Sequence, residues 1–325
     1  MKVGIIGTGA YSLALALNIS KNSHYIAMWS ESEEKINEWK KTHNLKSIAE
    51  DVKLPHSIIV TGSLKDTIEN ADAIIIACGS KYVSKVAEDM KEFYTKEKPI
   101  CIATKGLDDN KCEVFSKVLK TILKTNNIAV ISGPTFAIDI MHNDPVALAM
   151  AATNKITYET FEKILSNDRL KLRKSSNIVG VQICGSVKNI IAIASGILAG
   201  LGYSESTTAF LINESLHEIK KMIKCLGGNP KTILSFAGVG DLLMTCMSQK
   251  SRNYSFGYVI GHDKSKEAIK DFLKNHTVEG YNTLKTIITY NAKHHINIEL
   301  FHLINDIVDG KEKPEQLVTY LINKK

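Results

Sequence analysis

The two halves of this chain follow different hydrophobic patterns. Residues 1–178 alternate short runs of β-branched, apolar residues with helix-like segments. Strands that are apolar on both faces are typical of a parallel sheet covered by helices, and their alternation with helices predicts βαβ units. We therefore expect an α/β fold with a doubly wound, mostly parallel sheet. Its predicted strands are residues 3–6, 25–29, 58–60, 73–77, 100–103 and 128–131, with a further candidate at 147–152.

The pattern changes near Ile178. Beyond it strand-like alternation almost disappears, and residues 182–199 form a long apolar helical segment rich in small side chains. Residues 207–226 are amphipathic and end at Gly227-Gly228, which is a helix-stop signal. A chain of 325 residues has room for two domains. We expect an α/β domain over residues 1–178 and an all-helical (all-α) domain over residues 179–325.

Charge and cysteine usage narrow the function classes. The net charge is +7, yet only 3 of the 41 basic residues are arginine, and the lysines form no dense block. We interpret the charge as solvated surface rather than a nucleic-acid interface. Six scattered cysteines without a C-x-x-C pair favour free thiols over disulfides or a metal site. The chain opens without a signal peptide, and its most apolar stretch, residues 190–202, is shorter than the about 20 residues of a membrane span. We expect a cytoplasmic protein with no membrane span.

A glycine turn follows the first predicted strand. Gly7 permits a tight turn, and Gly9 allows a pyrophosphate to approach the backbone where a helix begins near Ala10. The free N–H groups and the positive dipole end of that helix attract the anion. Ser12 replaces the third glycine of the usual pattern. The alternative is a plain βα turn, but the position between a strand and a helix favours a Rossmann-type dinucleotide-binding domain.

An acidic residue follows the second predicted strand. Glu31 lies 22 residues after Gly9, where a carboxylate can accept hydrogen bonds from the adenosine ribose hydroxyls and repel a 2′-phosphate. Since no arginine is nearby, the position favours NADH over NADPH. The alternative is that Glu31 or Glu33 only caps the following helix.

Two polar motifs follow later strands. Lys105 comes after the strand at 100–103, and Gly133 and Thr135 come after the strand at 128–131. Ligands bind at the carboxyl ends of strands in open α/β sheets. Lys105 can therefore contact an anionic substrate and the nicotinamide region together, and the Thr135 hydroxyl can line the same cleft. Taken singly, either motif can be an ordinary turn.

The helical half carries a second set of polar residues. Lys188 is flanked by apolar side chains, and burial lowers the pKa of a lysine, which suits it to proton transfer. Asp241, in a G-x-G-D motif, can orient Lys188. Arg252 can hold a phosphate bidentately, and Asn253 can add a donor. The alternatives are a snorkelling surface lysine, a surface salt bridge and, for Glu279, a residue that only begins a helix.

Together these motifs resemble the NAD(P)-dependent glycerol-3-phosphate dehydrogenases of the soluble bacterial type, over essentially the whole chain. The markers are the glycine turn, T-K-G-L at 104–107, S-G-P-T-F-A at 132–137, K-N at 188–189, G-x-G-D at 238–241, S-R-N at 251–253 and V-E-G at 278–280. The sequence departs from the family pattern at three places, one of which is the cofactor-selecting position, often arginine in NADPH users and Glu31 here. Cys78-Gly79-Ser80 stands where V-P-S is usual, and residues 212–215 lack an arginine often found there.

The resemblance implies an oxidoreductase that reversibly reduces dihydroxyacetone phosphate to sn-glycerol 3-phosphate for glycerophospholipid synthesis. It implies hydride transfer from the nicotinamide C4, with Lys188 as proton donor and acceptor and with Lys105 and Asp241 as further catalytic residues. The implied substrate-binding residues are Lys105, Gly133, Thr135, Lys188, Asp241, Ser251, Arg252 and Asn253. The implied cofactor-binding residues are Tyr11, Lys105, Ala137, Arg252, Thr277 and Glu279, besides Gly7, Gly9, Ala10 and Glu31 of the first two motifs.

Two other functions fit the same fold. One is a related two-domain dehydrogenase acting on another small hydroxy acid, and the other is a non-catalytic nucleotide sensor. The S-R-N motif and the paired lysines argue against the first, because they fit a phosphate. Retention of a proton donor argues against the second. The resemblance also implies a homodimer, and we expect no metal.

Overall fold

The computed structural model describes residues 1–50, 52–263 and 265–324. Contacts within the chain divide it into two compact units. Unit 1 comprises Met1–Thr104 and Phe115–Ile178, and unit 2 comprises Lys105–Val114 and Val179–Lys325. The segment Lys105–Val114, which lies within residues 1–178, thus packs with the helical second half rather than with the sheet.

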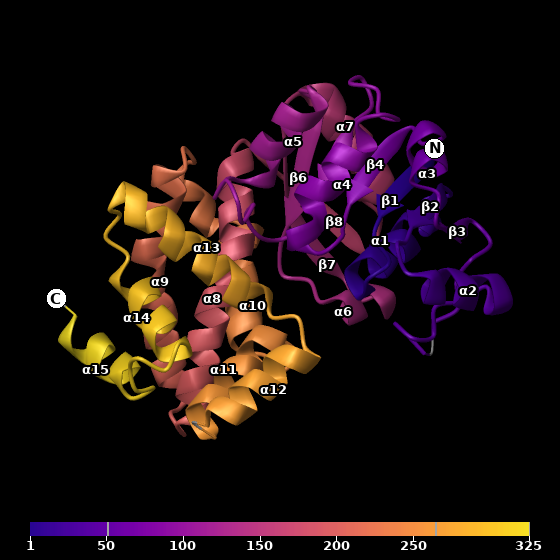
Figure 1. The fold of residues 1–325 in the computed structure, drawn as a ribbon. Coiled ribbons are helices and arrows are strands. Elements are labelled where there is room, and N and C mark those ends of the chain that lie inside the picture. Colours follow the sequence, from indigo (N-terminus) through magenta and orange to yellow (C-terminus); the bar gives the residue numbers. More distant parts are fainter. Residues whose placement is uncertain (51, 264, 325) are drawn as a thin grey trace. The chain divides into compact units, whose positions relative to one another are not determined.

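Unit 1 contains one eight-stranded sheet in the order β3-β2-β1-β4-β5-β6-β7-β8 (Figure 1). Neighbouring strands are parallel except β6 and β7, which are antiparallel. The predicted α/β class with a mostly parallel, doubly wound sheet is therefore confirmed. The strands are β1 (Lys2–Ile6), β2 (Tyr25–Trp29), β3 (Ile58–Thr61), β4 (Ala73–Ile76), β5 (Ile100–Ile102), β6 (Ile128–Ser132), β7 (Val146–Ala152) and β8 (Leu170–Ser175).

The strand β8 is the one that the sequence pattern missed. Buried Leu170 and Leu172 alternate with exposed Lys171 and Arg173, and the strand pairs with β7 at the edge of the sheet. An edge strand with one solvated face carries few apolar residues, so its alternation does not stand out from the surrounding polar sequence.

Helices cover the sheet and complete the core of unit 1. One buried cluster joins Ile5 and Met28 of the sheet to Leu13 and Phe161 of two helices. The helices are α1 (Ala10–Lys21), α2 (Glu33–Thr42), α3 (Leu64–Glu69), α4 (Val83–Met90), α5 (Phe115–Leu123), α6 (Ala137–Met141) and α7 (Lys155–Leu165), with a 3₁₀ turn η1 (Ser80–Tyr82).

Unit 2 is built from helices around the long helix α8 (Ile178–Gly200). Helix α8 is longer than the apolar stretch at 190–202 that the sequence analysis considered, and by length and composition alone it could cross a membrane. However, 89% of its most apolar part is buried inside the protein. It is the core helix of this unit. The others are α9 (Glu205–Cys225), α10 (Asp241–Cys246), α11 (Arg252–His262), α12 (Lys266–Asn275), α13 (Glu279–His294), α14 (Glu299–Val308) and α15 (Gln316–Asn323), with the turns η2 (Pro230–Leu234) and η3 (Phe236–Gly240).

Helices α8 and α11 approach each other so closely that only glycine fits at the contact. A Cβ on Gly196 would lie 2.0 Å from the Tyr254 carbonyl oxygen, and a Cβ on Gly257 would lie 1.9 Å from the Ile193 carbonyl oxygen. Real Cβ atoms do not come this close to backbone. The contact holds the helix that begins at Arg252 against the helix that carries Lys188.

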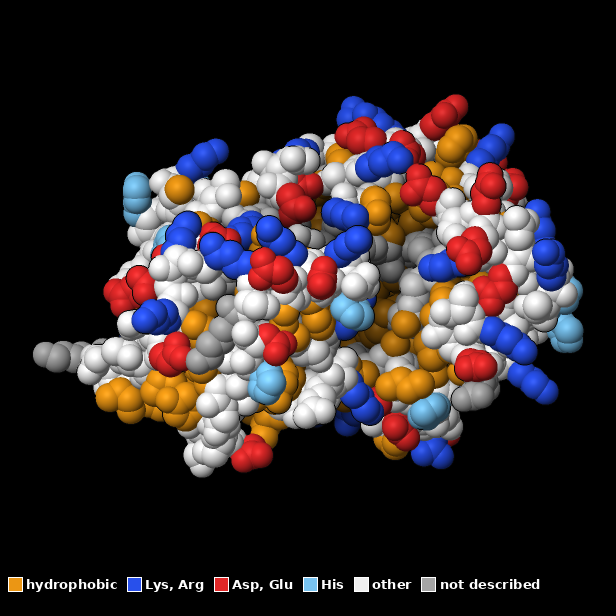
Figure 2. Space-filling model, turned by 60° about the horizontal axis from the view of Figure 1, so that its bottom comes forward, with side chains coloured by type: hydrophobic (Ala, Val, Ile, Leu, Met, Phe, Trp, Pro, Cys, Tyr) orange, Lys and Arg blue, Asp and Glu red, His pale blue; other side chains and the backbone are white. Residues whose placement is uncertain are grey.

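Charged side chains are mixed on the molecular surface. On the face drawn in Figure 2, lysine and arginine side chains are interspersed with aspartate and glutamate.

Candidate active site

The glycine turn after β1 has the shape that an anion site requires. Gly7 has a φ of 121°, and a Cβ there would lie 3.0 Å from the Ala77 carbonyl oxygen. A Cβ on Gly9, in contrast, would meet no protein atom within 4 Å. The packing of the protein therefore demands glycine at position 7 but leaves open space over position 9. That space lies where helix α1 begins at Ala10, so the N–H groups of its first turn fit the pyrophosphate of a dinucleotide.

Ser12 stands where the usual pattern has its third glycine, and it has a structural role. Its buried hydroxyl donates to the Ala77 carbonyl at 2.9 Å, which ties α1 to the end of β4. A small residue therefore still allows the close approach of helix and strand at this point.

Glu31 lies at the surface and does not cap a helix. The N-cap of α2 is Ser32, whose hydroxyl accepts from the Lys35 backbone N–H, so the capping alternative was wrong for Glu31. The Glu31 side chain is 68% exposed and lies 3.4 Å from the Lys85 ammonium. The Lys35 ammonium donates to the Thr8 carbonyl of the glycine turn at 3.1 Å. Two lysines thus accompany the acidic residue, a feature that the search for arginine overlooked.

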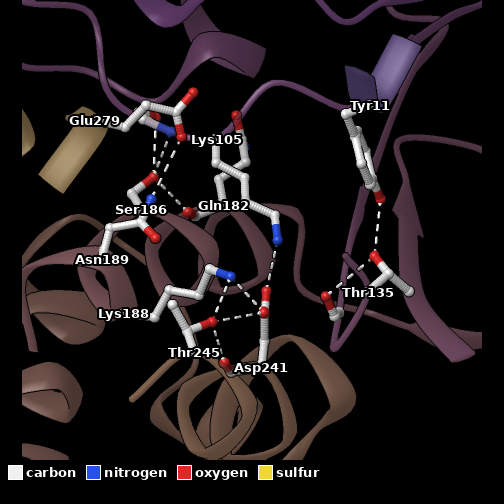
Figure 3. Close-up of polar contacts among 12 residues, drawn as sticks. Tyr11, Lys105, Thr135, Gln182, Ser186, Lys188, Asn189, Asp241, Thr245 and Glu279 are labelled. Carbon is white, nitrogen blue, oxygen red and sulfur yellow. Dashed lines mark hydrogen bonds and ion pairs between the residues drawn. The ribbon is translucent and has the colours of Figure 1, made fainter. Parts of the chain in front are cut away.

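A second cluster in unit 1 lies at the end of β6. The Tyr11 hydroxyl of α1 and the Thr135 hydroxyl are 3.1 Å apart (Figure 3). A Cβ on Gly133 would lie 2.7 Å from the Ala147 carbonyl oxygen, so glycine is required for β7 to pair with β6. Ala137 is the first residue of α6. The S-G-P-T-F-A motif therefore allows β7 to pack against β6 through Gly133 and places the Thr135 hydroxyl next to that of Tyr11.

In unit 2 a buried carboxylate holds two lysines. Asp241 is fully buried; its Oδ1 accepts from the Lys188 ammonium and its Oδ2 accepts from the Lys105 ammonium at 2.7 Å (Figure 3). The Lys188 ammonium also donates to the Thr245 hydroxyl at 2.8 Å. That hydroxyl donates to the Asp241 carbonyl at 2.6 Å. The predicted pairing of Asp241 with Lys188 is present, and the surface alternative for Lys188 was wrong.

Burial sets the charge state of this cluster. Burial and the positive charge of Lys105 lower the pKa of Lys188 and Asp241 raises it; the net result is a pKa of about 8 instead of the ordinary 10.5. Burial also raises the pKa of Cys184 to about 12 and that of Cys246 above its ordinary value. Both thiols therefore stay protonated near neutral pH, and Lys188 is the group of this cluster poised to exchange a proton.

The G-x-G-D motif places Asp241 at the start of a helix. Gly238 packs so tightly that a Cβ there would lie 2.0 Å from the Ile233 carbonyl oxygen. The turn η3 ends at Gly240, and Asp241 is the first residue of α10, where the helix dipole stabilises a carboxylate. Gly238 thus serves backbone packing, and the aspartate serves the site.

The S-R-N motif begins helix α11. The buried Ser251 is the N-cap and its hydroxyl accepts from the Tyr254 backbone N–H. Arg252 is exposed at the first helical position. The Asn253 Oδ1 accepts from the Gly280 backbone N–H at 2.8 Å, which leaves its Nδ2 group as the predicted donor.

The V-E-G motif begins helix α13 beside the same residues. Glu279 is the first residue of this helix, as expected if it only begins a helix. Its carboxylate also accepts a hydrogen bond from the Asn189 amide at 3.4 Å. Burial raises the pKa of Glu279, and the charges of Arg252, Lys105 and Lys188 oppose that rise. Thr277 is exposed just before the helix. A carboxylate, an arginine and two lysines of unit 2 therefore share one electrostatic environment.

Two residues of unit 2 were not identified from the sequence. Thr245 follows Asp241 by four residues on one helix, and this spacing, which places both on one face, was an available signal. Ser186 is buried and bonds to the Gly106 backbone next to Lys105. No local pattern identifies Ser186, because its partner lies 80 residues away along the chain.

Comparison with known proteins decides the family. The model of the NAD-dependent glycerol-3-phosphate dehydrogenase N-terminus matches residues 2–157, and that of the C-terminus matches residues 177–319. The chain belongs to the NAD-dependent glycerol-3-phosphate dehydrogenase family. The resemblance stated from the motifs is thereby confirmed, including its extent over both halves.

Individual relatives support the same family assignment. The chain is 33% identical to glycerol-3-phosphate dehydrogenase [NAD(P)+] of Thermoanaerobacter sp. (strain X514), covering 100% of this chain and 97% of the relative. The structure of glycerol-3-phosphate dehydrogenase from Coxiella burnetii matches with a TM-score of 0.94 and 28% identity, over 99% of each chain. D-mandelate dehydrogenase shares only the fold, with a TM-score of 0.63 at 15% identity.

Proposed function

We propose that this protein reversibly reduces dihydroxyacetone phosphate to sn-glycerol 3-phosphate with a nicotinamide cofactor and supplies glycerophospholipid synthesis. The observation that carries the proposal is the buried cluster of Lys188, Asp241 and Lys105 in a member of this dehydrogenase family. A carbonyl reductase needs an acid next to the carbonyl oxygen, and Lys188 is an acid whose pKa burial lowers to about 8.

Lys188 has the properties of a reversible proton donor. With a pKa of about 8 it is largely protonated at neutral pH, so it can protonate the alkoxide that develops during reduction. Near the same pH it also exists in part as a free amine and can accept the alcohol proton during oxidation. Asp241 and Thr245 fix the direction of its ammonium through hydrogen bonds. The positive charge of Lys105 adds electrostatic stabilisation of the developing oxyanion.

The phosphate of the substrate requires a cationic anchor, and we assign that task to Arg252. Its guanidinium is exposed at the N-terminus of α11, where the helix dipole also favours an anion. Asn253 and Ser251 of the same turn are further substrate-binding residues, with Lys105, Lys188 and Asp241. Anchoring the phosphate fixes the carbonyl in place and so lowers the entropic cost of the reaction. In unit 1, Gly133 and Thr135 complete the proposed substrate-binding set.

The residues of unit 1 fit a nicotinamide dinucleotide. The open space over Gly9 and the N–H groups in the first turn of α1 suit its pyrophosphate, while Gly7 shapes the turn and donates its own N–H to the Trp29 carbonyl. When bound, the reduced cofactor supplies the hydride for the carbonyl carbon. Glu31 suits ribose hydroxyls and repels a 2′-phosphate, so we propose that NADH is preferred over NADPH. The other proposed cofactor-side residues are Ala137 in unit 1 and Lys105, Arg252, Thr277 and Glu279 in unit 2.

Three further parts of the proposal follow from the family and the sequence. Residues 1–178, apart from the segment Lys105–Val114, serve as the dinucleotide-binding domain, and residues 179–325 together with that segment serve as the substrate-binding domain. The enzyme acts as a homodimer, which light scattering tests directly. It works in the cytoplasm, in keeping with free cysteines at every position for which the structure describes a thiol.

The test is the loss of absorbance at the reduced nicotinamide band with dihydroxyacetone phosphate, with NADH and NADPH run in parallel. Lys188→Ala should abolish turnover while cofactor binding, followed by nicotinamide fluorescence, persists. Lys171→Ala removes an exposed lysine of β8 and is the matched control, which should leave the rate unchanged. A folded wild-type protein that binds NADH but never oxidises it would favour the nucleotide sensor. Turnover with another hydroxy acid instead would favour the related dehydrogenase.

A further inference from the structure

One buried serine anchors the segment that carries Lys105. The Ser186 hydroxyl of α8 accepts from the Gly106 backbone N–H at 3.0 Å and lies 2.9 Å from the Gly106 carbonyl oxygen (Figure 3). It also lies 2.7 Å from the Gln182 carbonyl oxygen. A hydroxyl has one hydrogen and so donates to only one of these two carbonyls at a time. Ser186 is fully buried, so no solvent replaces either contact.

The backbone next to Lys105 can adopt its course because residue 106 is glycine. Gly106 has a φ of 136°, a conformation that side-chain-bearing residues rarely adopt. Glycine is also the most flexible residue, so the peptide needs an external partner to keep this conformation. Ser186 is that partner. The Lys105 side chain is thus held at both ends, through Ser186 at the backbone and through Asp241 at the ammonium.

We propose that Ser186 is a positioning residue for the reaction: by holding the Gly106 peptide it keeps the Lys105 ammonium on Asp241, so that Lys105 and Lys188 share one carboxylate. Ser186 touches neither the substrate nor the reacting atoms in this scheme, and it acts only through Lys105. The inference rests on the proposed role of Lys188 as the acid.

Sharing the carboxylate controls how readily Lys188 gives up its proton. Lys105 repels the Lys188 ammonium and lowers its pKa, while Asp241 raises it. If Lys105 withdraws, Lys188 loses the repulsion and no longer shares Asp241 with a second lysine, so its pKa rises. The other titratable groups around Lys188 are Cys184 on its own helix, Cys246 of α10 and Glu279 of α13, with Arg252 of α11 facing Glu279. None of these bonds to Ser186 in the contacts described above, so a change at Ser186 reaches them through the charge of Lys105, which also acts on Glu279.

The far end of the segment has its own anchor. The Thr286 hydroxyl donates to the Asp109 carboxylate at 2.7 Å, and the Cys112 thiol donates to the Thr286 carbonyl. Loss of the Ser186 hydroxyl therefore frees the part next to Lys105 while residues 109–112 stay attached to α13. A local change of position is expected rather than unfolding of the segment.

The experiment compares Ser186→Ala with Ser215→Ala. Ser215 is also fully buried, and its hydroxyl donates only to the Ile212 carbonyl of its own helix among the described contacts. For Ser186→Ala we expect kcat/KM for dihydroxyacetone phosphate to fall about ten- to hundredfold, as misplacement of a catalytic group does. We also expect the pH at which reduction is half-lost to rise by about half a unit or more. Ser186→Cys, which keeps the shape but bonds weakly, should lie between wild type and Ser186→Ala.

A second readout does not depend on turnover. The rate at which cyanate modifies the Lys188 amine, followed by peptide mass across a pH series, reports the Lys188 pKa directly, because only the free amine reacts. The midpoint should move upward in Ser186→Ala and stay in place in Ser215→Ala. If the two variants give the same kinetics and the same Lys188 midpoint, Ser186 only supports packing and the proposal is overturned. If wild type fails to turn over substrate, the proposed function fails, while the Lys188 midpoint still decides the role of Ser186.

Discussion

Replacing Thr245 by valine should lower the pKa of Lys188 and shift the pH range in which the enzyme reduces its substrate. Valine has nearly the shape of threonine, so the substitution removes the hydroxyl and little else. The bond that this hydroxyl donates to the Asp241 backbone carbonyl is lost. The contact that Lys188 loses is the 2.8 Å hydrogen bond that its ammonium donates to the Thr245 hydroxyl. That bond favours the charged form of Lys188, so its loss makes the proton easier to remove.

The magnitude follows from the energy of the bond. A hydrogen bond to a charged group is worth about 1.5–3 kcal/mol, and about 1.4 kcal/mol corresponds to one pKa unit. The pKa of Lys188 should therefore fall from about 8 to about 6–7. At about pH 7.5 the protonated fraction then drops from about three-quarters to about one-tenth. Reduction should be about eightfold slower at that pH and should recover as the pH is lowered.

The assay is kcat/KM against pH in both directions. Oxidation of glycerol 3-phosphate needs the free amine, so Thr245→Val should move its rise to lower pH as well. Thr283→Val makes the same substitution at another buried position of unit 2 and should leave both midpoints in place. A uniform loss of rate at every pH, with unchanged midpoints, would refute the reasoning and reduce Thr245 to a packing role.

Three further predictions test separate parts of the structure. The pKa of Lys188 is about 8 in the folded protein and 10.5 in the unfolded chain, so between these pH values the unfolded chain binds more protons. The free energy of unfolding should therefore rise by about 3 kcal/mol from about pH 8 to about pH 10.5. Lys188→Met should remove this rise in urea titrations. Gly7→Ala should cost about 1–3 kcal/mol of stability because of its positive φ, whereas Gly9→Ala should leave the melting temperature nearly unchanged and weaken NADH binding in a titration. Glu31→Ala should raise kcat/KM with NADPH relative to NADH about five- to tenfold, and an unchanged ratio would contradict the assigned role of Glu31.

Much of the candidate site could be predicted from short stretches of sequence. The positions of Gly7 and Gly9 between a strand and a helix predicted a turn that the structure contains, and the apolar neighbours of Lys188 predicted its burial. Both inferences depend on residues adjacent in the chain, where periodicity and backbone freedom leave few options. The edge strand β8 was missed for the opposite reason, since half of its side chains face solvent and its pairing partner lies outside the local pattern.

The α/β class, the helical second half, the glycine turn and the residue types of the site are encoded in short stretches of sequence. The environment of Lys188 depends instead on contacts over long separations, such as the bond from Lys105 to Asp241 across 136 residues. Which unit the segment Lys105–Val114 packs with, how two lysines share one carboxylate, and which serine holds that segment were decided only when the chain folded. A pKa depends on burial and on charges within a few ångströms, and those distances are properties of the tertiary structure.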